Sequence, residues 1–360
     1  MAKKNEGPSY EKIITDLKNK KYAPVYFLEG EEPYYIDAIA DYIAEHVLDE
    51  SEREFNQSIL YGKDVDVIRI LSEAKRFPMM AERQVLIVKE AQELKDLEKN
   101  TTVSVIVGAK KKNEEINLFE EYLKNPQPTT LLVICYKYKS LDKRKSLAKA
   151  VAQSSVLFTS SKLYDNQVPA WIESHTREKG LKIGPHASAL MAEYLGADLS
   201  RIANEIEKLK INLKGRREIE SDDVQTFIGI SKDYNVFELN SAIGLRNVVK
   251  ANRIINYFAA NPKENPFVLV IANLYSYFSK ILLYHAAPDK SQYTVAGLMG
   301  VSPFFVKDYE SAAKTFTLDK VRRIIGFLRE YDLKSKGIEG TGNVEHGELM
   351  KELLFKILHV

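Results

Sequence analysis

Pro24-Val-Tyr-Phe-Leu28, followed by the turn Glu29-Gly-Glu-Glu-Pro33, opens the first recognisable unit of the chain. The apolar run predicts a short buried strand. After the turn, apolar residues recur at helical spacing, at Ile36, Ile39, Ile43 and Val47. A strand, a glycine-containing turn and a helix, in that order, are typical of the start of an α/β nucleotide-binding domain.

The sequence up to residue 160 continues this alternation. A helix is predicted over Val65–Lys75, and apolar strands are predicted at Gln84–Val88, Thr130–Tyr136 and Val156–Thr159. Strands that alternate with helices favour a parallel sheet covered by helices on both faces. The charged segment Leu94–Asn125 is predicted to be helical in part. Its apolar patch Val103–Val107, closed by Gly108, fits either an extra strand or a buried turn.

After Ser161 the pattern changes to helices, with no further convincing strand. Residues 161–230 predict a small helical domain with helices at Gln167–Lys179, His186–Leu195 and Leu199–Leu209. A fourth helix is predicted to begin after Ser221 as its N-cap and to end at Gly229. Residues 231–360 predict a larger all-helical domain, whose clearest helices are Val268–Leu282, Leu318–Tyr331 and Glu345–Leu358.

The composition is that of a soluble globular protein. The 360 residues are 45% hydrophobic and 28% charged, with a net charge of +2, which mildly favours protein partners over bare DNA. Met1–Glu11 is polar, unlike a signal peptide, and no run of about 18 apolar residues predicts a membrane span. The single cysteine, Cys135, fits a small core residue in a reducing compartment, so we expect a cytoplasmic protein.

The turn at Glu29–Pro33 lacks the chemistry of a phosphate site. A phosphate loop needs glycines, a lysine and a hydroxyl, whereas this turn carries three glutamates and one glycine. The single Gly-Lys pair, Gly62-Lys63, is followed by Asp64 and has no glycine five residues before it. The α/β pattern is therefore present without residues that would bind a nucleotide phosphate.

No catalytic or metal-binding pattern emerges either. The strands at 84–88 and 130–136 lead into Lys89-Glu90 and Lys137, and neither supplies an aspartate to anchor magnesium. The histidines are scattered, and no Cys/His spacing matches a metal site. We expect no cofactor, no metal and no catalytic site.

Two segments remain as candidate binding sites. Phe77-Pro-Met-Met80 lies between a helix and a strand, where flexible methionines suit a partner's apolar pocket; the alternative is core packing. Lys137–Lys145 carries five cations that suit DNA phosphates, or simply form a solvated loop. They are Lys137, Lys139, Lys143, Arg144 and Lys145.

Five segments, in order, resemble the bacterial clamp-loader delta subunit family of DNA polymerase III. Pro24–Pro33 resembles its first strand and turn, with acid where an ATPase has glycines and lysine. Further matches are Phe77–Val88, Ser140–Ser146, Gly196–Leu209 and Phe237–Ile243. The segment around Lys99–Leu118 is longer than the family usually has.

The resemblance implies an AAA+-like domain without ATPase motifs, a helical lid domain and a C-terminal helical collar. It implies that an apolar pair inserts into the sliding clamp and opens one interface. That pair falls on Met79 and Met80, flanked by Phe77 and Pro78; the family more often has Leu-Phe there. The implied partners are the sliding clamp, loader subunits of the gamma/tau and delta-prime types, and primed DNA within the assembled complex, with no membrane.

Two other hypotheses stay open at this point. One is an active AAA+-type ATPase with an unorthodox phosphate site, which turnover of ATP by the isolated chain would reveal. The other is a DNA-binding accessory factor acting through Lys137–Lys145, which predicts a steep salt dependence of DNA affinity for the isolated chain.

Overall fold

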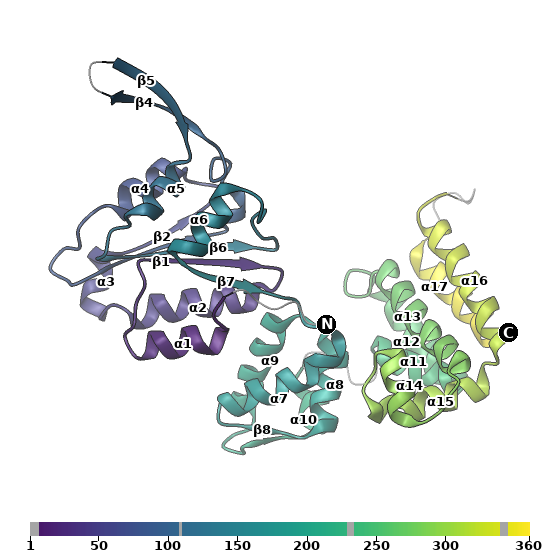
Figure 1. Ribbon diagram of the computed structural model, residues 1–360. Helices are drawn as coiled ribbons and strands as arrows, with labels where there is room; N and C mark the ends of the chain where they lie inside the picture. The colour runs from purple at the N-terminus through teal and green to yellow at the C-terminus, as the bar shows by residue number, and fades with distance from the viewer. Residues whose placement is uncertain (1–6, 108–109, 229–233, 339–344) are drawn as a thin grey trace. The chain divides into compact units, whose positions relative to one another are not determined.

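The computed structural model describes residues 7–107, 110–228, 234–338 and 345–360. It divides into two compact units, Met1–Lys162 and Leu163–Val360, and each is described by itself (Figure 1). The predicted boundary between residues 230 and 231 lies outside the described residues, as do Gly108 and Gly229. The further division of the second unit therefore stays a prediction.

The first unit is built on a five-stranded parallel sheet in the order β2-β3-β6-β1-β7. Strand β1 lies between β6 and β7, so that Phe27 is opposite Ile134 on one side and Leu157 on the other. The strands are β1 Val25–Gly30, β2 Gln57–Tyr61, β3 Gln84–Lys89, β6 Thr130–Lys137 and β7 Val156–Ser160.

Helices cover both faces of this sheet, as the sequence predicts. Alternate residues of β1 enter two separate apolar clusters, because side chains on a strand point to opposite faces. Phe27 packs with α4, α5 and α6, and Leu28 packs with α1 and α2. The helices are α1 Tyr10–Lys18, α2 Pro33–His46, α3 Glu50–Asn56, α4 Val67–Ala74, α5 Leu118–Lys124 and α6 Ser146–Ser154, and a short 3-10 turn, η1, spans Ala91–Glu93.

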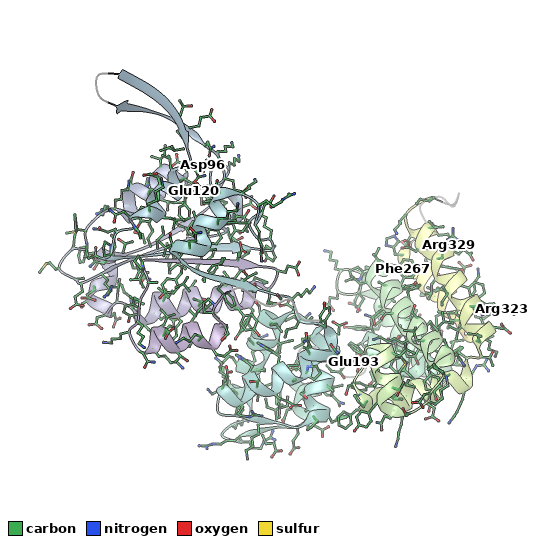
Figure 2. All side chains as sticks on the ribbon, viewed as in Figure 1. Asp96, Glu120, Glu193, Phe267, Arg323 and Arg329 are labelled. Atoms are coloured by element: carbon green, nitrogen blue, oxygen red, sulfur yellow. The ribbon has the colours of Figure 1, made fainter. Side chains whose placement is uncertain are left out.

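The apolar patch at Val103–Val107 belongs to a strand, not to a buried turn. Strand β4, Thr101–Val107, pairs with β5, Lys110–Ile116, as an antiparallel hairpin that projects from the first unit (Figure 1). Asn117 ties the base of the hairpin by donating to the carbonyl oxygens of Leu97 at 2.8 Å and Lys99 at 3.2 Å. Asp96 and Glu120 lie below the hairpin in Figure 2.

The first part of the second unit is a small helical bundle. The prediction of no strand after Ser161 is wrong in detail, because β8, Lys182–Ile183, pairs with β9, Glu218–Ile219. The N-cap of the fourth helix is Glu220, not Ser221, because Glu220 and Asp223 form a capping box. The helical elements are η2 Asp165–Gln167, α7 Val168–Glu178, α8 Pro185–Leu195, α9 Leu199–Asn212 and α10 Ser221–Phe227.

The rest of the second unit is helical and shares one apolar core. The long helix α13 packs against α16, and α12 packs against α17. The helical elements are α11 Val236–Gly244, α12 Val248–Ala260, α13 Phe267–Ala286, α14 Gln292–Met299, η3 Pro303–Phe305, α15 Val306–Thr315, α16 Leu318–Ser335 and α17 His346–Leu358.

Helix α13 is long and apolar enough to cross a membrane by length and composition alone. Its apolar residues Val270, Leu274 and Phe278 are buried in the core of this unit, against neighbouring helices. A helix that is mostly apolar and lies in a protein core has the same composition. One face of α13 therefore belongs to the core, while Val268 and Leu269 are exposed.

Candidate protein-interaction site

The loop between α4 and β3 presents exposed apolar side chains. The exposed fraction is 77% for Phe77, 55% for Met79 and 102% for Met80. Met80 also has a left-handed backbone, with φ of 53°. The alternative of core packing for the two methionines does not fit these exposures, because a packed side chain loses most of its accessible surface.

Asn56, the last residue of α3, holds this loop. Its Oδ1 accepts a hydrogen bond from Met79 N at 2.6 Å, and its Nδ2 donates to Met79 O at 2.9 Å. Asn56 itself is 5% exposed. One buried amide thus satisfies both backbone polar groups of Met79.

The two ends of the loop are held by β3. Gln84 Nε2 donates to Arg76 O and to Thr130 Oγ1, both at 2.7 Å. Thr130 Oγ1 in turn donates to Ala74 O at 2.8 Å. The bond to Ala74 O uses a carbonyl group that the end of α4 leaves unpaired, and the bond to Arg76 O holds the first turn of the loop. The loop is therefore fixed to the sheet where it begins and where it ends.

The turn between β1 and α2 already uses its amide groups within the chain. Gly30 N donates to Lys139 O at 3.1 Å, and Glu31 N donates to Ser160 O at 3.2 Å. Glu32 N donates to the hydroxyl of Ser160 at 3.2 Å. In a phosphate loop such amides donate to the phosphate. Here they donate to Lys139 and Ser160, which lie just after β6 and at the end of β7.

A carboxylate fills the space beside this turn. Glu29 is 3% exposed, and its side chain accepts from Leu141 N at 2.8 Å and from the hydroxyl of Thr159 at 3.3 Å. Burial raises the pKa of Glu29, and the hydrogen bond from Leu141 opposes this. A buried acid at this position makes the turn unfavourable for a polyanion.

The predicted basic cluster is divided by the structure. Lys137 is buried, and its Nζ lies 2.7 Å from Asp37 Oδ1 and 3.1 Å from Glu90 Oε1. Burial lowers the pKa of Lys137, but the hydrogen bonds to Asp37 and Glu90 outweigh it and leave the pKa raised. The expectation that Lys137 faces DNA is therefore corrected, because its charge is used inside the fold.

The other four cations of the cluster are exposed. Arg144 pairs with Asp142 at 2.8 Å, and Lys145 pairs with Glu98. Lys139 Nζ donates to Gln92 O at 3.2 Å. Internal carboxylates thus reduce the net positive field that this loop offers to DNA.

The described residues contain no group of three or more His, Cys, Asp and Glu side chains that could hold a metal ion. Cys135 is buried in β6, and burial raises the pKa of its thiol to about 12. A thiol with this pKa is a poor nucleophile at neutral pH. Cys135 is thus a core residue.

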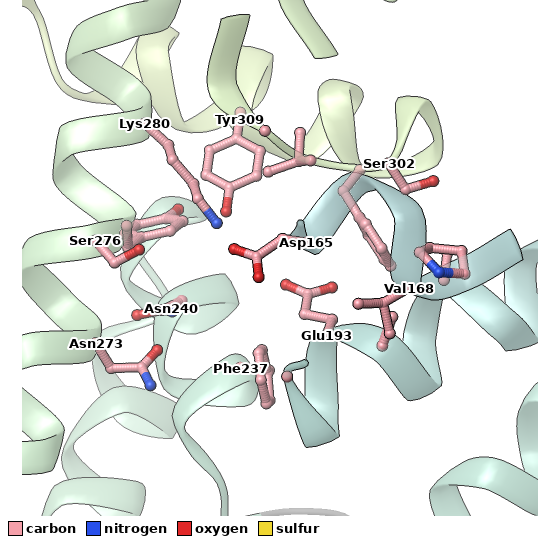
Figure 3. Close-up of a pocket in the computed structure, with 18 of the residues that line it drawn as sticks. Asp165, Val168, Glu193, Phe237, Asn240, Asn273, Ser276, Lys280, Ser302 and Tyr309 are labelled. Atoms are coloured by element: carbon pink, nitrogen blue, oxygen red, sulfur yellow. The ribbon is translucent and has the colours of Figure 1, made fainter. Parts of the chain in front are cut away.

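The second unit contains a cavity of about 490 Å³ that no sequence pattern indicates. Asp165, Glu193 and Lys280 point into it in Figure 3. They come from η2, α8 and α13, so no local motif joins them. Burial raises the pKa of Glu193 to about 7, while Lys280 lowers it and Asp308 raises it further.

We expect Glu193→Gln to change how stability depends on pH. The folded state binds the Glu193 proton more tightly than the unfolded state does, so wild type loses stability as pH rises from about 4.5 through 7. The glutamine cannot ionise, so the unfolding free energy of the variant should gain about 2 kcal/mol on wild type between pH 5 and 8, allowing for solvent in the cavity.

Urea unfolding followed by the fluorescence of Trp171, the one tryptophan of the chain, measures this in the second unit. The exposed Glu264→Gln in the same unit is the control and should show no such trend. A constant difference between Glu193→Gln and wild type across this pH range would contradict the prediction.

Comparison with known proteins finds two family models that match this chain, and both describe the same subunit. The family model "DNA polymerase III, delta subunit" matches residues 26–161, and the model of the "C-terminal domain" of the same subunit matches residues 233–357. The first matched range contains both the loop at Met79 and Met80 and the turn at Gly30.

Curated relatives match along most of the chain. DNA polymerase III subunit delta of Bacillus subtilis is 28% identical over 351 residues, covering 96% of each chain. Probable DNA polymerase III subunit delta of Aquifex aeolicus is 22% identical over 326 residues, covering 87% of this chain and 86% of that protein. The solved structure of the Bacillus subtilis DNA clamp loader delta protein covers 98% of this chain and 100% of its own, with a TM-score of 0.58 and 24% identity.

Proposed function

This chain belongs to the DNA polymerase III delta subunit family, and from that premise we propose that it binds the sliding clamp and opens one clamp interface. The observation that carries the proposal is the loop at Met79 and Met80, whose apolar side chains are exposed on a backbone held by three side-chain hydrogen bonds. Burying one such side chain in a partner's pocket is worth about 1.5–3 kcal/mol.

The proposed mechanism is differential binding. If the pocket for Met79 and Met80 is better formed in the open clamp than in the closed clamp, binding shifts the clamp toward the open state. The shift is limited to the difference between the two binding free energies. The chain then needs no chemical step of its own to open the clamp.

In this proposal ATP energy comes from partner subunits of the gamma/tau and delta-prime types. Support comes from the turn at Gly30, where Lys139 and Ser160 accept the bonds of the amides that a phosphate would need. The buried Glu29 adds a further obstacle to phosphate. Loading of the clamp onto primed DNA would take place in the cytoplasm, within the assembled complex.

Direct contact with DNA is a secondary part of the proposal. Lys139, Lys143, Arg144 and Lys145 stay on the exposed side of their loop after Lys137 is removed from the predicted cluster. Because Arg144 and Lys145 also pair with carboxylates of this chain, we expect weak DNA binding by the isolated chain. Weak DNA binding by the isolated chain, with little dependence on salt, would count against the hypothesis of a DNA-binding accessory factor.

The test is binding of the purified full chain to a surface carrying the purified sliding clamp, with no other subunit present. We expect saturable binding whose affinity does not change when ATP and Mg²⁺ are added. The isolated chain should also show no ATP turnover above a buffer blank. Absence of clamp binding would refute the proposal, and measurable turnover would favour the alternative of an active ATPase.

A further inference from the structure

We propose that Asn56 is a positioning residue for clamp binding, because it holds the loop in the conformation that exposes Met80. This inference rests on the proposed function of Met79 and Met80 and adds a buried residue that bonds to the backbone of Met79. Asn56 lies 23 positions before Met79 in the sequence, at the end of a different helix.

The geometry of Asn56 leaves its side chain no freedom. Oδ1 and Nδ2 engage the two backbone groups of Met79, and Nδ2 also donates to Glu52 O of its own helix at 3.1 Å. Reversing the amide would face donor with donor and acceptor with acceptor at Met79. The side chain therefore has one orientation, and it fixes the backbone of Met79 relative to α3.

The two bonds from Asn56 to Met79 also affect the backbone of Met80. Met80 has φ of 53°, a region that costs a non-glycine residue free energy and persists only where the surroundings enforce it. Asn56 enforces it from the N-terminal side, by fixing Met79. With its backbone in this conformation, Met80 projects its side chain fully into solvent.

A loop that already has its bound conformation binds more tightly than one that must become ordered on contact. The conformational entropy lost on ordering then does not reduce the binding free energy. The apparent dissociation constant equals the intrinsic constant divided by the fraction of molecules whose loop is formed, so it rises as that fraction falls. If loss of the Asn56 bonds leaves the loop formed about a tenth of the time, clamp affinity falls about 10-fold. The loss should lie mainly in the association rate, because few molecules are competent to bind.

The experiment compares Asn56→Ala with Asn117→Ala in the full chain. Asn117 is a matched control, since it is 6% exposed, lies in the same unit and donates to the backbone of a distant segment at Leu97 and Lys99. We expect Asn56→Ala to bind the clamp about 10-fold more weakly, and Asn117→Ala to bind as wild type does. Asn56→Asp, which can accept from Met79 N but cannot donate to Met79 O, should fall between Asn56→Ala and wild type.

Hydrogen exchange of the Met79 amide, measured without the clamp, separates positioning from general stability. Asn56→Ala should lose protection at Met79 N, while Asn117→Ala and the double variant Met79→Ser with Met80→Ser keep protection at position 79. Wild-type clamp affinity in Asn56→Ala would overturn the inference alone. Wild-type affinity in the double serine variant would overturn the proposed site, whatever Asn56→Ala does.

Discussion

Replacing Met79 and Met80 together by serine is expected to weaken clamp binding about 100-fold or more. Each methionine that is buried in a partner contributes about 1.5–3 kcal/mol, so the pair contributes at least about 3 kcal/mol. A difference of 1.4 kcal/mol is a factor of ten in the dissociation constant. The fold itself should be unaffected, because both side chains are exposed and the Asn56 bonds reach only the backbone.

The control for this double variant is Val248→Ser with Val249→Ser. These neighbours are also an exposed apolar pair, 44% and 63% exposed, but they lie in α12 of the second unit. Surface binding to the clamp gives the affinity, and circular dichroism gives the fold. Equal clamp affinity for the methionine variant and wild type would remove this loop from the binding site.

Gly30→Ala is expected to destabilise the first unit by about 3 kcal/mol or more. Gly30 has φ of 129°, where a side chain is strained, and a Cβ there would lie 2.1 Å from the carbonyl oxygen of Ser160. Backbone strain of this kind costs about 1–3 kcal/mol, and forcing neighbours apart costs a similar amount. Both terms act on the turn that joins β1 to α2.

Gly180→Ala separates backbone strain from the steric contact with Ser160. Gly180 also has positive φ, at 76°, but a Cβ there would meet nothing within 4 Å. It should therefore lose about 1 kcal/mol from strain alone. Urea unfolding, followed by circular dichroism for the whole chain and by Trp171 fluorescence for the second unit, measures both variants. Similar losses in the two variants would show that contact with Ser160 does not contribute.

The sequence predicted the central strands and the long helices because their apolar patterns are strong. Strand β1 is buried along its whole length, and α13 repeats apolar residues over many turns. The edge strand β2, in contrast, went unpredicted, because Gln57-Ser-Ile-Leu-Tyr61 is only partly buried and lacks strict alternation. The short helices α1 and α3 were missed for a related reason, since they bury few residues.

Pairing partners were harder to predict than elements. The apolar run Val103–Val107 indicates a strand. Its pairing partner Lys110–Ile116 is highly charged and has no apolar pattern that would indicate one. The burial of Lys137 depends on Asp37 and Glu90, which lie far away in the sequence. The contact between Asn56 and Met79 likewise joins an ordinary helix end to a loop. Such contacts depend on tertiary structure, which local patterns do not encode.

The hydroxyl and carbonyl of Ser160 determine what it would take to make the turn at Gly30 bind a phosphate. Introducing a glycine–lysine–serine sequence there would not by itself create a phosphate site, because the end of β7 would still occupy the amides. A phosphate site would require the strand end, the buried Glu29 and the turn to change together.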